Sequence, residues 1–186
     1  MMMKEGIRIL AIDDSTIFSF EENVLVVGVI GRRDMLEGIV SFKVIKDGDD
    51  ATEKIKKAVK NSRFREQIRI IVLNGTVVAG MNVVDLIKLK KELNIPIMAI
   101  TRKTPHPDML KKCITSSEKH DYINKLKILD SNIKSAKING IRNMYVQSVG
   151  INKKDIAKHF ENSVRLLRIA HIIANGVARG ESKGRF

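Results

Sequence analysis

The arrangement of apolar and polar positions in the first part of the chain predicts three β-strands. Residues 7–12, 24–30 and 39–45 form short runs that are rich in β-branched residues and leucine. The segments at residues 21–23 and 31–34 are short and polar, which is typical of connections between antiparallel neighbours. We therefore predict an antiparallel meander at the start of the fold.

The hydrophobic period then changes, and helices are expected to alternate with strands. Polar residues with N-cap spacing open two predicted helices, at residues 50–60 and 82–93. Apolar runs at residues 68–73 and 95–101 are typical of strands buried on both faces. The remaining predicted elements are helices at residues 108–114 and 118–133, a strand at residues 144–149, and a helical region from residue 152 to about residue 178 that is interrupted near Asn162.

This order of elements predicts one α/β domain over residues 1–186. A meander followed by strand–helix–strand units gives a mixed sheet, because such units form right-handed parallel crossovers. The first strand is expected to be central, with the fourth beside it and helices on the flanks. Both strands end in polar residues, at the edge where open α/β sheets place their sites.

Acidic residues gather at this predicted edge. Asp13 and Asp14 end the first strand, residues 47–50 carry three aspartates after the third, and Asn74 ends the fourth. Oxygen ligands of this kind suit Mg²⁺ or Mn²⁺, which could support phosphodiester cleavage. The expected metal ligands are Asp13, Asp14, Asp47, Asp50 and Asn74, and the expected catalytic residues are Asp13, Asp14, Asp50 and Asn74.

A structural interpretation competes with the metal site at part of this cluster. Residues 47–50 also read as a turn followed by a helix N-cap, where aspartate is favoured for its own reasons. Asp13 differs, because a carboxylate at the end of a buried strand is costly unless it is paired or bound to metal. Asp13 is therefore the principal candidate.

Charge points to a polyanionic partner. The chain has 34 Lys and Arg against 21 Asp and Glu, a net charge of +13. Such a balance favours nucleic acid, although a solvated lysine-rich surface would give the same composition. Aromatic residues make up only 4%, which argues against long base-stacking platforms. The basic residues expected to contact nucleic acid are Arg32, Arg33, Arg102, Lys103, Arg179 and Arg185.

Other features of the sequence bear on the cellular compartment and on further candidate residues. The single cysteine, Cys113, excludes an internal disulfide and fits a reducing cytoplasm, in a helix where it should be core or partly buried. No apolar run is long enough to span a membrane, and we expect no signal peptide. His171 lies on an apolar helical stripe, where burial habits favour a core residue over a catalyst. No glycine-rich phosphate loop supports an enzyme of small phosphorylated substrates.

Several of these segments resemble known families. Residues 9–15, 71–75 and 96–102 resemble strand motifs of endonuclease V. A smaller archaeal family, sometimes called endonuclease dU, is similar over nearly the whole chain. Its hallmarks look like Asp13 with Asp14, residues 47–52, residues 80–85 and residues 179–182.

The resemblance implies a ribonuclease H-like fold and a function in DNA repair. It implies metal-dependent cleavage of nucleic acid that contains a deaminated base such as uracil or hypoxanthine; DNA is favoured over RNA, and both stay open. It also adds Gly80 and Asn82 to the expected nucleic-acid contacts. Asn74 stands where endonuclease V has an aspartate, so a non-catalytic nucleic-acid-binding or adaptor protein of the same fold is the alternative.

Overall fold

A seven-stranded mixed sheet organises the protein, with the strand order β3-β2-β1-β4-β7-β9-β8. The computed structural model describes residues 3–182 except 19, 21, 103–105 and 117–121. The strands of the sheet are β1 (Arg8–Asp14), β2 (Asn23–Arg32), β3 (Met35–Ile45), β4 (Ile68–Asn74), β7 (Ile97–Thr101), β8 (Lys137–Ile141) and β9 (Met144–Val149). A separate small hairpin consists of β5 (Val77–Val78) and β6 (Asn82–Val83).

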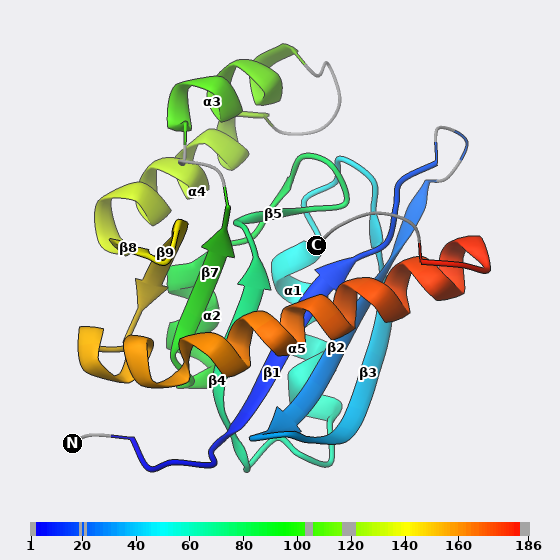
Figure 1. The fold of residues 1–186 in the computed structure, drawn as a ribbon. Coiled ribbons are helices and arrows are strands. Elements are labelled where there is room, and N and C mark those ends of the chain that lie inside the picture. Colours follow the sequence, from blue (N-terminus) through cyan, green and yellow to red (C-terminus); the bar gives the residue numbers. More distant parts are fainter. Residues whose placement is uncertain (1–2, 19, 21, 103–105, 117–121, 183–186) are drawn as a thin grey trace.

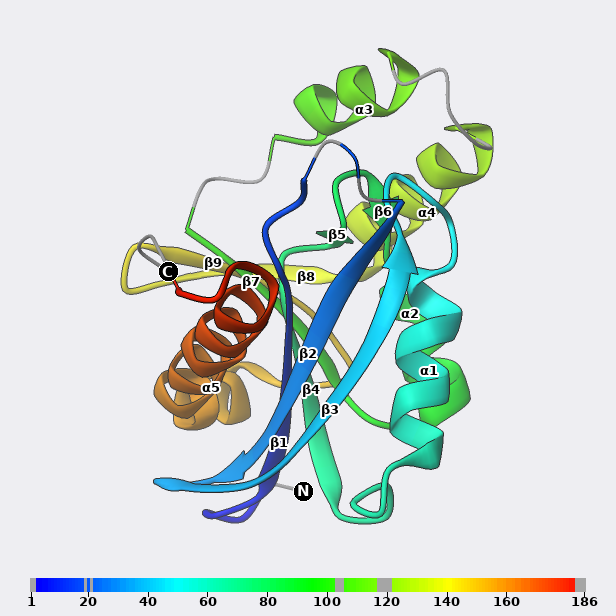
Figure 2. The ribbon, with the colours of Figure 1, turned by 90° about the vertical axis from the view of Figure 1, so that its right-hand side faces the viewer.

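Helices cover both faces of the sheet. They are α1 (Ala51–Asn61), α2 (Leu86–Leu93), α3 (Pro107–Ser116), α4 (Tyr122–Ser135) and α5 (Lys153–Arg179). α5 crosses one face, α1 and α2 cover the other, and α3 with α4 lies beyond the end of β7 (Figures 1 and 2). None of the helices in the described ranges is long and apolar enough to cross a membrane.

The two helical layers create two apolar cores, one on each side of the central strands. Residues 9–12 of β1 and 70–73 of β4 are at most 1% exposed, since alternate side chains enter opposite cores. This explains why their sequences are continuous apolar runs rather than alternating ones. β3, at the edge of the sheet, alternates partly buried and exposed positions instead.

Strand direction decides where the candidate site lies. β1 pairs antiparallel with β2 and parallel with β4, and β4 pairs parallel with β7. The carboxyl ends of β1, β4 and β7 therefore meet at one edge of the sheet. The predicted mixed sheet with an antiparallel meander and a ribonuclease H-like arrangement is confirmed; β1 lies inside the sheet, although β4 holds the middle position.

Several local expectations were wrong. The helix predicted at residues 82–93 begins only at Leu86, with Asp85 as its N-cap, because residues 82–83 form β6. α5 continues past Asn162 without interruption, because the helix packs against the sheet along its length; the Asn162 side chain accepts a hydrogen bond from Arg165 and leaves the helical backbone intact. β8 was not expected, since its sequence has a lysine, an asparagine and a glycine in five residues. The β8–β9 hairpin reverses the chain, so β9 runs antiparallel to β7 rather than parallel.

Candidate active site

Asp13 is buried at the carboxyl edge and engaged at both oxygens. It is 2% exposed. Its Oδ1 accepts hydrogen bonds from the backbone N–H of Asp14, at 2.9 Å, and from Nδ2 of Asn74, at 3.1 Å. Its Oδ2 lies 3.0 Å from Nδ1 of His171 on α5. β1, β4 and α5 thus all contribute to its surroundings.

Asp14 is directed toward the opposite layer. Consecutive strand residues point to opposite faces, so Asp14 faces the α1–α2 side while Asp13 faces α5. Oδ2 of Asp14 accepts a 2.6 Å hydrogen bond from the backbone N–H of Ala79, in the loop between β5 and β6. The two neighbouring carboxylates are therefore anchored to different parts of the protein.

Both carboxyl groups have a pKa above the ordinary value of an aspartate. Burial raises the pKa of Asp13 to about 8, and the nearby charge of Asp14 adds to this shift, against the hydrogen bond from Asn74. Burial also raises the pKa of Asp14, and the hydrogen bond from Ala79 opposes it. A cation beside the pair would favour the ionised forms, which makes this edge electrostatically suited to a metal ion.

His171 belongs to this site and not to the apolar core, so its predicted core placement is wrong. Its side chain is 26% exposed and contacts Asp13. Partial burial lowers the pKa of His171, and the charge of Asp14 opposes this. The side chain is therefore mainly neutral at neutral pH. Packing of the apolar residues around it leaves the imidazole at the sheet edge.

Asn175 is a residue of the site that the sequence analysis missed. It is 2% exposed, one helical turn beyond His171. Its Oδ1 accepts hydrogen bonds from the backbone N–H and the hydroxyl of Thr16, at 3.0 and 2.6 Å. Its Nδ2 donates to the carbonyl of His171 at 2.9 Å. Asn175 therefore ties the segment after β1 to α5; its spacing of four from His171 was the available signal.

Asp47 fixes the loop that contacts Asp14. Its backbone N–H donates to the carbonyl of Ala79 at 2.8 Å, and its Oδ1 accepts from the N–H of Met81 at 2.9 Å. Gly80 lies between these contacts with φ of +88°, and a Cβ there would overlap Oδ1 of Asp47. The predicted nucleic-acid contact at Gly80 thus coincides with a position where the backbone requires glycine.

Asp50 and Asn82 form a second, buried connection. Nδ2 of Asn82 donates to Asp50 Oδ1 at 2.8 Å and to the carbonyl of Ile45 at 3.0 Å. Its Oδ1 accepts from the N–H of Ala51 at 3.1 Å, and the residue is 0% exposed. Its polar atoms are satisfied inside the protein, so we correct its expected role from contacting nucleic acid to fixing the β3–α1 turn.

The structure therefore divides the predicted acidic cluster. Asp13, Asp14 and Asn74 lie together, whereas Asp47 and Asp50 are hydrogen-bonded to the loop at residues 79–82. Asp50 does occupy the N-cap position of α1, but its side chain makes no capping hydrogen bond. Within the described ranges, no group of three or more His, Cys, Asp or Glu side chains is arranged to hold a metal ion.

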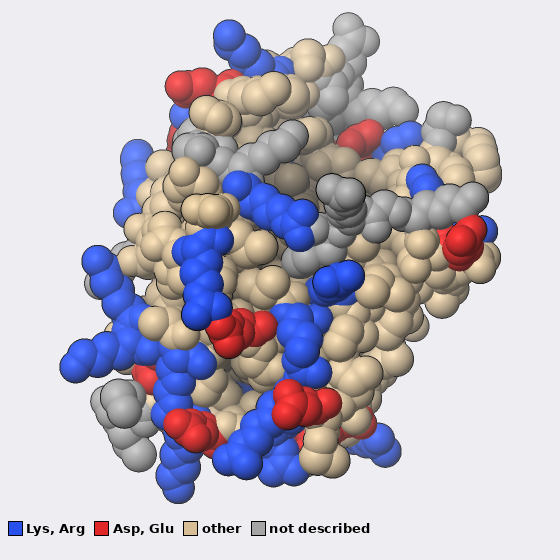
Figure 3. All heavy atoms as spheres, viewed as in Figure 1, with Lys and Arg blue, Asp and Glu red and all other residues tan. Residues whose placement is uncertain are grey.

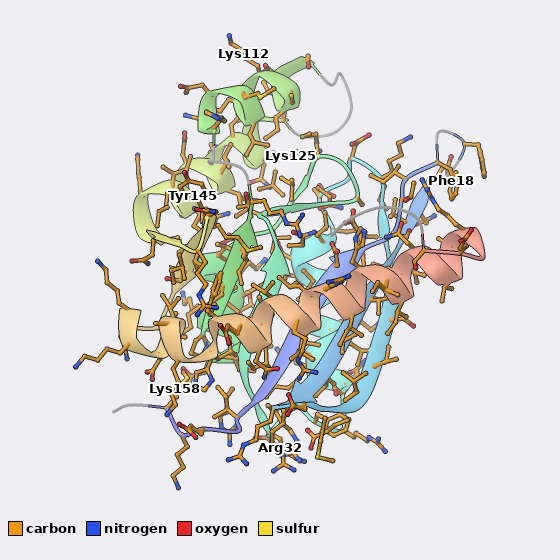
Figure 4. All side chains as sticks on the ribbon, viewed as in Figure 1. Phe18, Arg32, Lys112, Lys125, Tyr145 and Lys158 are labelled. Atoms are coloured by element: carbon orange, nitrogen blue, oxygen red, sulfur yellow. The ribbon has the colours of Figure 1, made fainter. Side chains whose placement is uncertain are left out.

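The predicted basic contacts fall at different places. Arg102 is exposed just after β7, at the same edge as Asp13. Arg179 ends α5, with its guanidinium 5.8 Å from the ring centre of Phe18, which follows β1. Arg32 lies at the far end of the sheet from Phe18, paired with Glu37 at 3.3 Å (Figure 4).

The hairpin residue Arg33 shares the far end of the sheet and is exposed with φ of +50°. The predicted contacts Lys103 and Arg185 lie outside the described residues. Cys113 is partly buried, as expected. Arg102 and Arg179 are thus the predicted arginines that the fold places on the side of the carboxylate pair.

The fold and this edge define a ribonuclease H-like α/β protein with a buried aspartate pair at the ends of its central strands. The chain belongs to the Endonuclease dU family, whose sequence model matches residues 5–178. The family resemblance seen in the sequence is confirmed.

Curated relatives cover almost the entire chain. A UPF0215 protein of Methanosarcina mazei is 36% identical over 98% of this chain and 96% of its own length. Another, from Methanothermobacter thermautotrophicus, is 35% identical over 98% and 93%. A solved structure of a protein of unknown function from Archaeoglobus fulgidus is similar, with a TM-score of 0.81, 28% identity, and coverage of 92% of this chain and 98% of that one.

A more remote likeness extends to endonuclease V of Ciona intestinalis. It has 11% identity and a TM-score of 0.45, over 77% of this chain and 70% of that one. This similarity is too remote to assign a site or an activity.

Proposed function

We propose that the protein is a metal-dependent endonuclease that cleaves nucleic acid near a deaminated base. The observation that carries the proposal is the aspartate pair: Asp13 is 2% exposed at a strand end, and burial with the charge of Asp14 raises its pKa to about 8. Burial and mutual repulsion make it unfavourable for two adjacent carboxylates to be ionised there. A bound cation would offset this electrostatic cost.

The donor set fits a hard divalent ion. Mg²⁺ is commonly held by one or two protein carboxylates, with water and substrate phosphate as further ligands. Asp13 would be the principal ligand and Asp14 a second. Asn74 donates through its Nδ2 to Asp13, which leaves its amide oxygen for a cation or water. A bound Mg²⁺ or Mn²⁺ ion would activate a water molecule and stabilise the leaving oxygen of the phosphodiester.

His171 supplies the proton chemistry of the proposal. Its Nδ1 lies against Asp13, and its lowered pKa keeps an unprotonated imidazole at neutral pH. Such a group can orient the Asp13 carboxylate and accept a proton at the edge where the nucleic acid binds. Arg102, which follows β7 at the same edge, would contact phosphate.

The proposed substrate is DNA containing uracil or hypoxanthine. Family membership and the net charge of +13 support a nucleic-acid substrate, because lysine and arginine contacts to phosphate supply most non-specific affinity. Enzymes that act at a single base in a duplex generally flip it out of the stack. The deaminated base is proposed from the family description and awaits a direct assay.

A non-catalytic nucleic-acid-binding protein is the second candidate. Asn74 favours it, since a neutral amide stands where endonuclease V has an aspartate and the described part of the chain groups no three metal-binding side chains. In that case the charge and the fold would remain while cleavage is lost.

The deciding experiment is a cleavage assay on labelled DNA and RNA with a single uracil or hypoxanthine. Reactions contain Mg²⁺, Mn²⁺ or chelator, and Asp13→Asn is compared with Asp49→Asn, an exposed turn aspartate. Metal-dependent cleavage that is lost in Asp13→Asn and kept in Asp49→Asn supports the nuclease. Binding without cleavage supports the second candidate, and cleavage restored by Asn74→Asp would locate the cause.

A further inference from the structure

A groove lies between α1 and the edge strand β3, on the layer that Asp14 faces. It has a volume of about 460 Å³. Lys54, Lys57 and Asn61 line it from α1, and Val40 and Phe42 line it from β3. Lys43, the neighbour of Phe42, directs its side chain to the opposite face of the sheet. Lys54 and Lys57 are both exposed. The groove therefore presents a basic surface outside the site described above.

The two flanks of α1 differ in charge balance. On the flank facing α2, Lys56 pairs with Glu53 and Glu92, the latter at 2.7 Å. Lys88 of α2 also pairs with Glu53, at 2.8 Å. These lysines are neutralised by acids at close range.

The flank facing β3 lacks such acids. No described acidic side chain forms an ion pair with Lys54 or Lys57, and the groove that they line contains no Asp or Glu. Positive charge without counter-charge in a concave surface attracts polyanions more strongly than a paired surface does. The asymmetry follows from the pairing of Glu53. Positions 54, 57 and 61 share the side of α1 toward β3, and Glu53, one turn before Lys57, pairs instead with Lys56 and Lys88.

The groove and Asp14 lie on the same face of the sheet, with the buried Val26 between them. The strand registers place Asp14, Val26 and Phe42 in one row across β1, β2 and β3. Neighbouring strands lie about 4.8 Å apart, so Phe42 lies roughly 10 Å from Asp14 along this row. Roughly three nucleotides of a strand span that distance at about 3.4 Å each.

Arg102 and Arg179 also lie on the side of the carboxylate pair, whereas many other basic side chains are less well placed. On the face that α5 crosses, Lys and Arg are spread over its left and lower parts, while the right-hand flank is largely uncharged (Figure 3). Arg32 lies at the opposite end of the sheet and is paired with Glu37. The β3–α1 groove combines unpaired lysines with proximity to Asp14.

We propose that this groove binds the phosphate backbone of the nucleic acid on one side of the proposed cleavage site, through Lys54 and Lys57. The inference rests on the proposed function, since it supplies part of the substrate path of the same site. The contacts are to phosphate, so they act on all base sequences alike.

The test is the salt dependence of binding, measured by fluorescence anisotropy with labelled DNA in chelator, so that no cleavage occurs. Lys54→Gln/Lys57→Gln is compared with Lys88→Gln/Lys158→Gln, which removes the same charge at exposed positions outside the groove. Each phosphate contact that is lost lowers the slope of log K against log salt by about one, so the groove variant should lose about two and the control distinctly less. Lys54→Arg/Lys57→Arg should retain the slope of the unmodified protein.

Equal slopes of log K against log salt for the groove and control variants would overturn the inference. The same result is expected if the groove binds an acidic protein instead of nucleic acid. A far-UV circular dichroism melt checks that both variants are folded. Failure of the proposed function is separate: unmodified protein that binds DNA with a lysine-dependent slope but never cleaves it supports the groove and contradicts the nuclease. Absence of any DNA binding by the unmodified protein would overturn both.

Discussion

Replacing Asp13 with asparagine should stabilise the metal-free protein while abolishing the proposed metal site. The pKa of Asp13 rises from 3.8 to about 8 on folding, so the folded state holds this proton more tightly than the unfolded chain does. Stability that is present at low pH is therefore lost as pH rises toward about 8. Asparagine has the same shape and no ionised form, and its Oδ1 can still accept from Asn74.

The magnitude follows from the pH window. Each pH unit in which only the folded state holds the proton changes the free energy of unfolding by up to about 1.4 kcal/mol. Between the ordinary value of 3.8 and pH 7 the upper bound is about 4 kcal/mol, and because Asp13 and Asp14 share this titration we expect about 1–3 kcal/mol. Asp13→Asn should exceed the unmodified protein in stability by that amount at neutral pH.

Urea unfolding in chelator at several pH values measures this difference. Asp49→Asn is the matched control and should follow the unmodified protein. Adding Mg²⁺ or Mn²⁺ should then raise the stability of the unmodified protein, by about 2.7 kcal/mol at a hundred times the dissociation constant, and leave Asp13→Asn unchanged. A stability of the unmodified protein that does not fall between acidic and neutral pH would refute the reasoning about the buried pair.

Two further predictions concern the residues that hold the site in place. Asn175→Ala removes two hydrogen bonds to Thr16 and should lower the free energy of unfolding by about 2 kcal/mol, whereas Asn162→Ala on the same helix should change it by less than about 0.5 kcal/mol; equal losses in thermal melts would contradict the role of Asn175. Gly80→Ala places a Cβ against Asp47 at a positive φ and should cost about 2 kcal/mol or more. Gly176→Ala, a helical position with open space, should stabilise by about 0.5–1 kcal/mol, and the reverse order in urea titrations would show that the loop tolerates a side chain.

The sheet could be predicted because the sequence features that specify its strands lie within a few residues of one another. Continuous apolar runs in β1 and β4 and the polar connection between β2 and β3 specify burial and pairing within a few residues. β8 carried no such signal, because its pairing with β9 depends on a hairpin turn at Arg142 and Asn143, both with positive φ. The continuity of α5 was likewise decided by packing along its whole length rather than by any single polar residue.

Half of the candidate site was accessible from the sequence, namely the carboxylates at the strand ends. The functions of Asp47, Asp50 and Asn82 were not, because turn, cap and ligand roles favour the same residue types and only long-range hydrogen bonds separate them. His171 and Asn175 reach the site from a helix more than 150 residues away in sequence. That contact depends on how α5 crosses the sheet, which periodicity alone does not specify.

Asp13 and Asp14 are consecutive in the chain yet belong to different halves of the molecule. Asp13 is held through His171 to the layer of α5, and Asp14 through Ala79 to the layer of α1 and α2. The end of β1 therefore connects the two helical layers, each of which packs on its own face of the sheet. Any sliding of one layer against the other changes the angle between the two carboxylates, so substitutions deep in either core can alter the geometry of the pair without touching it.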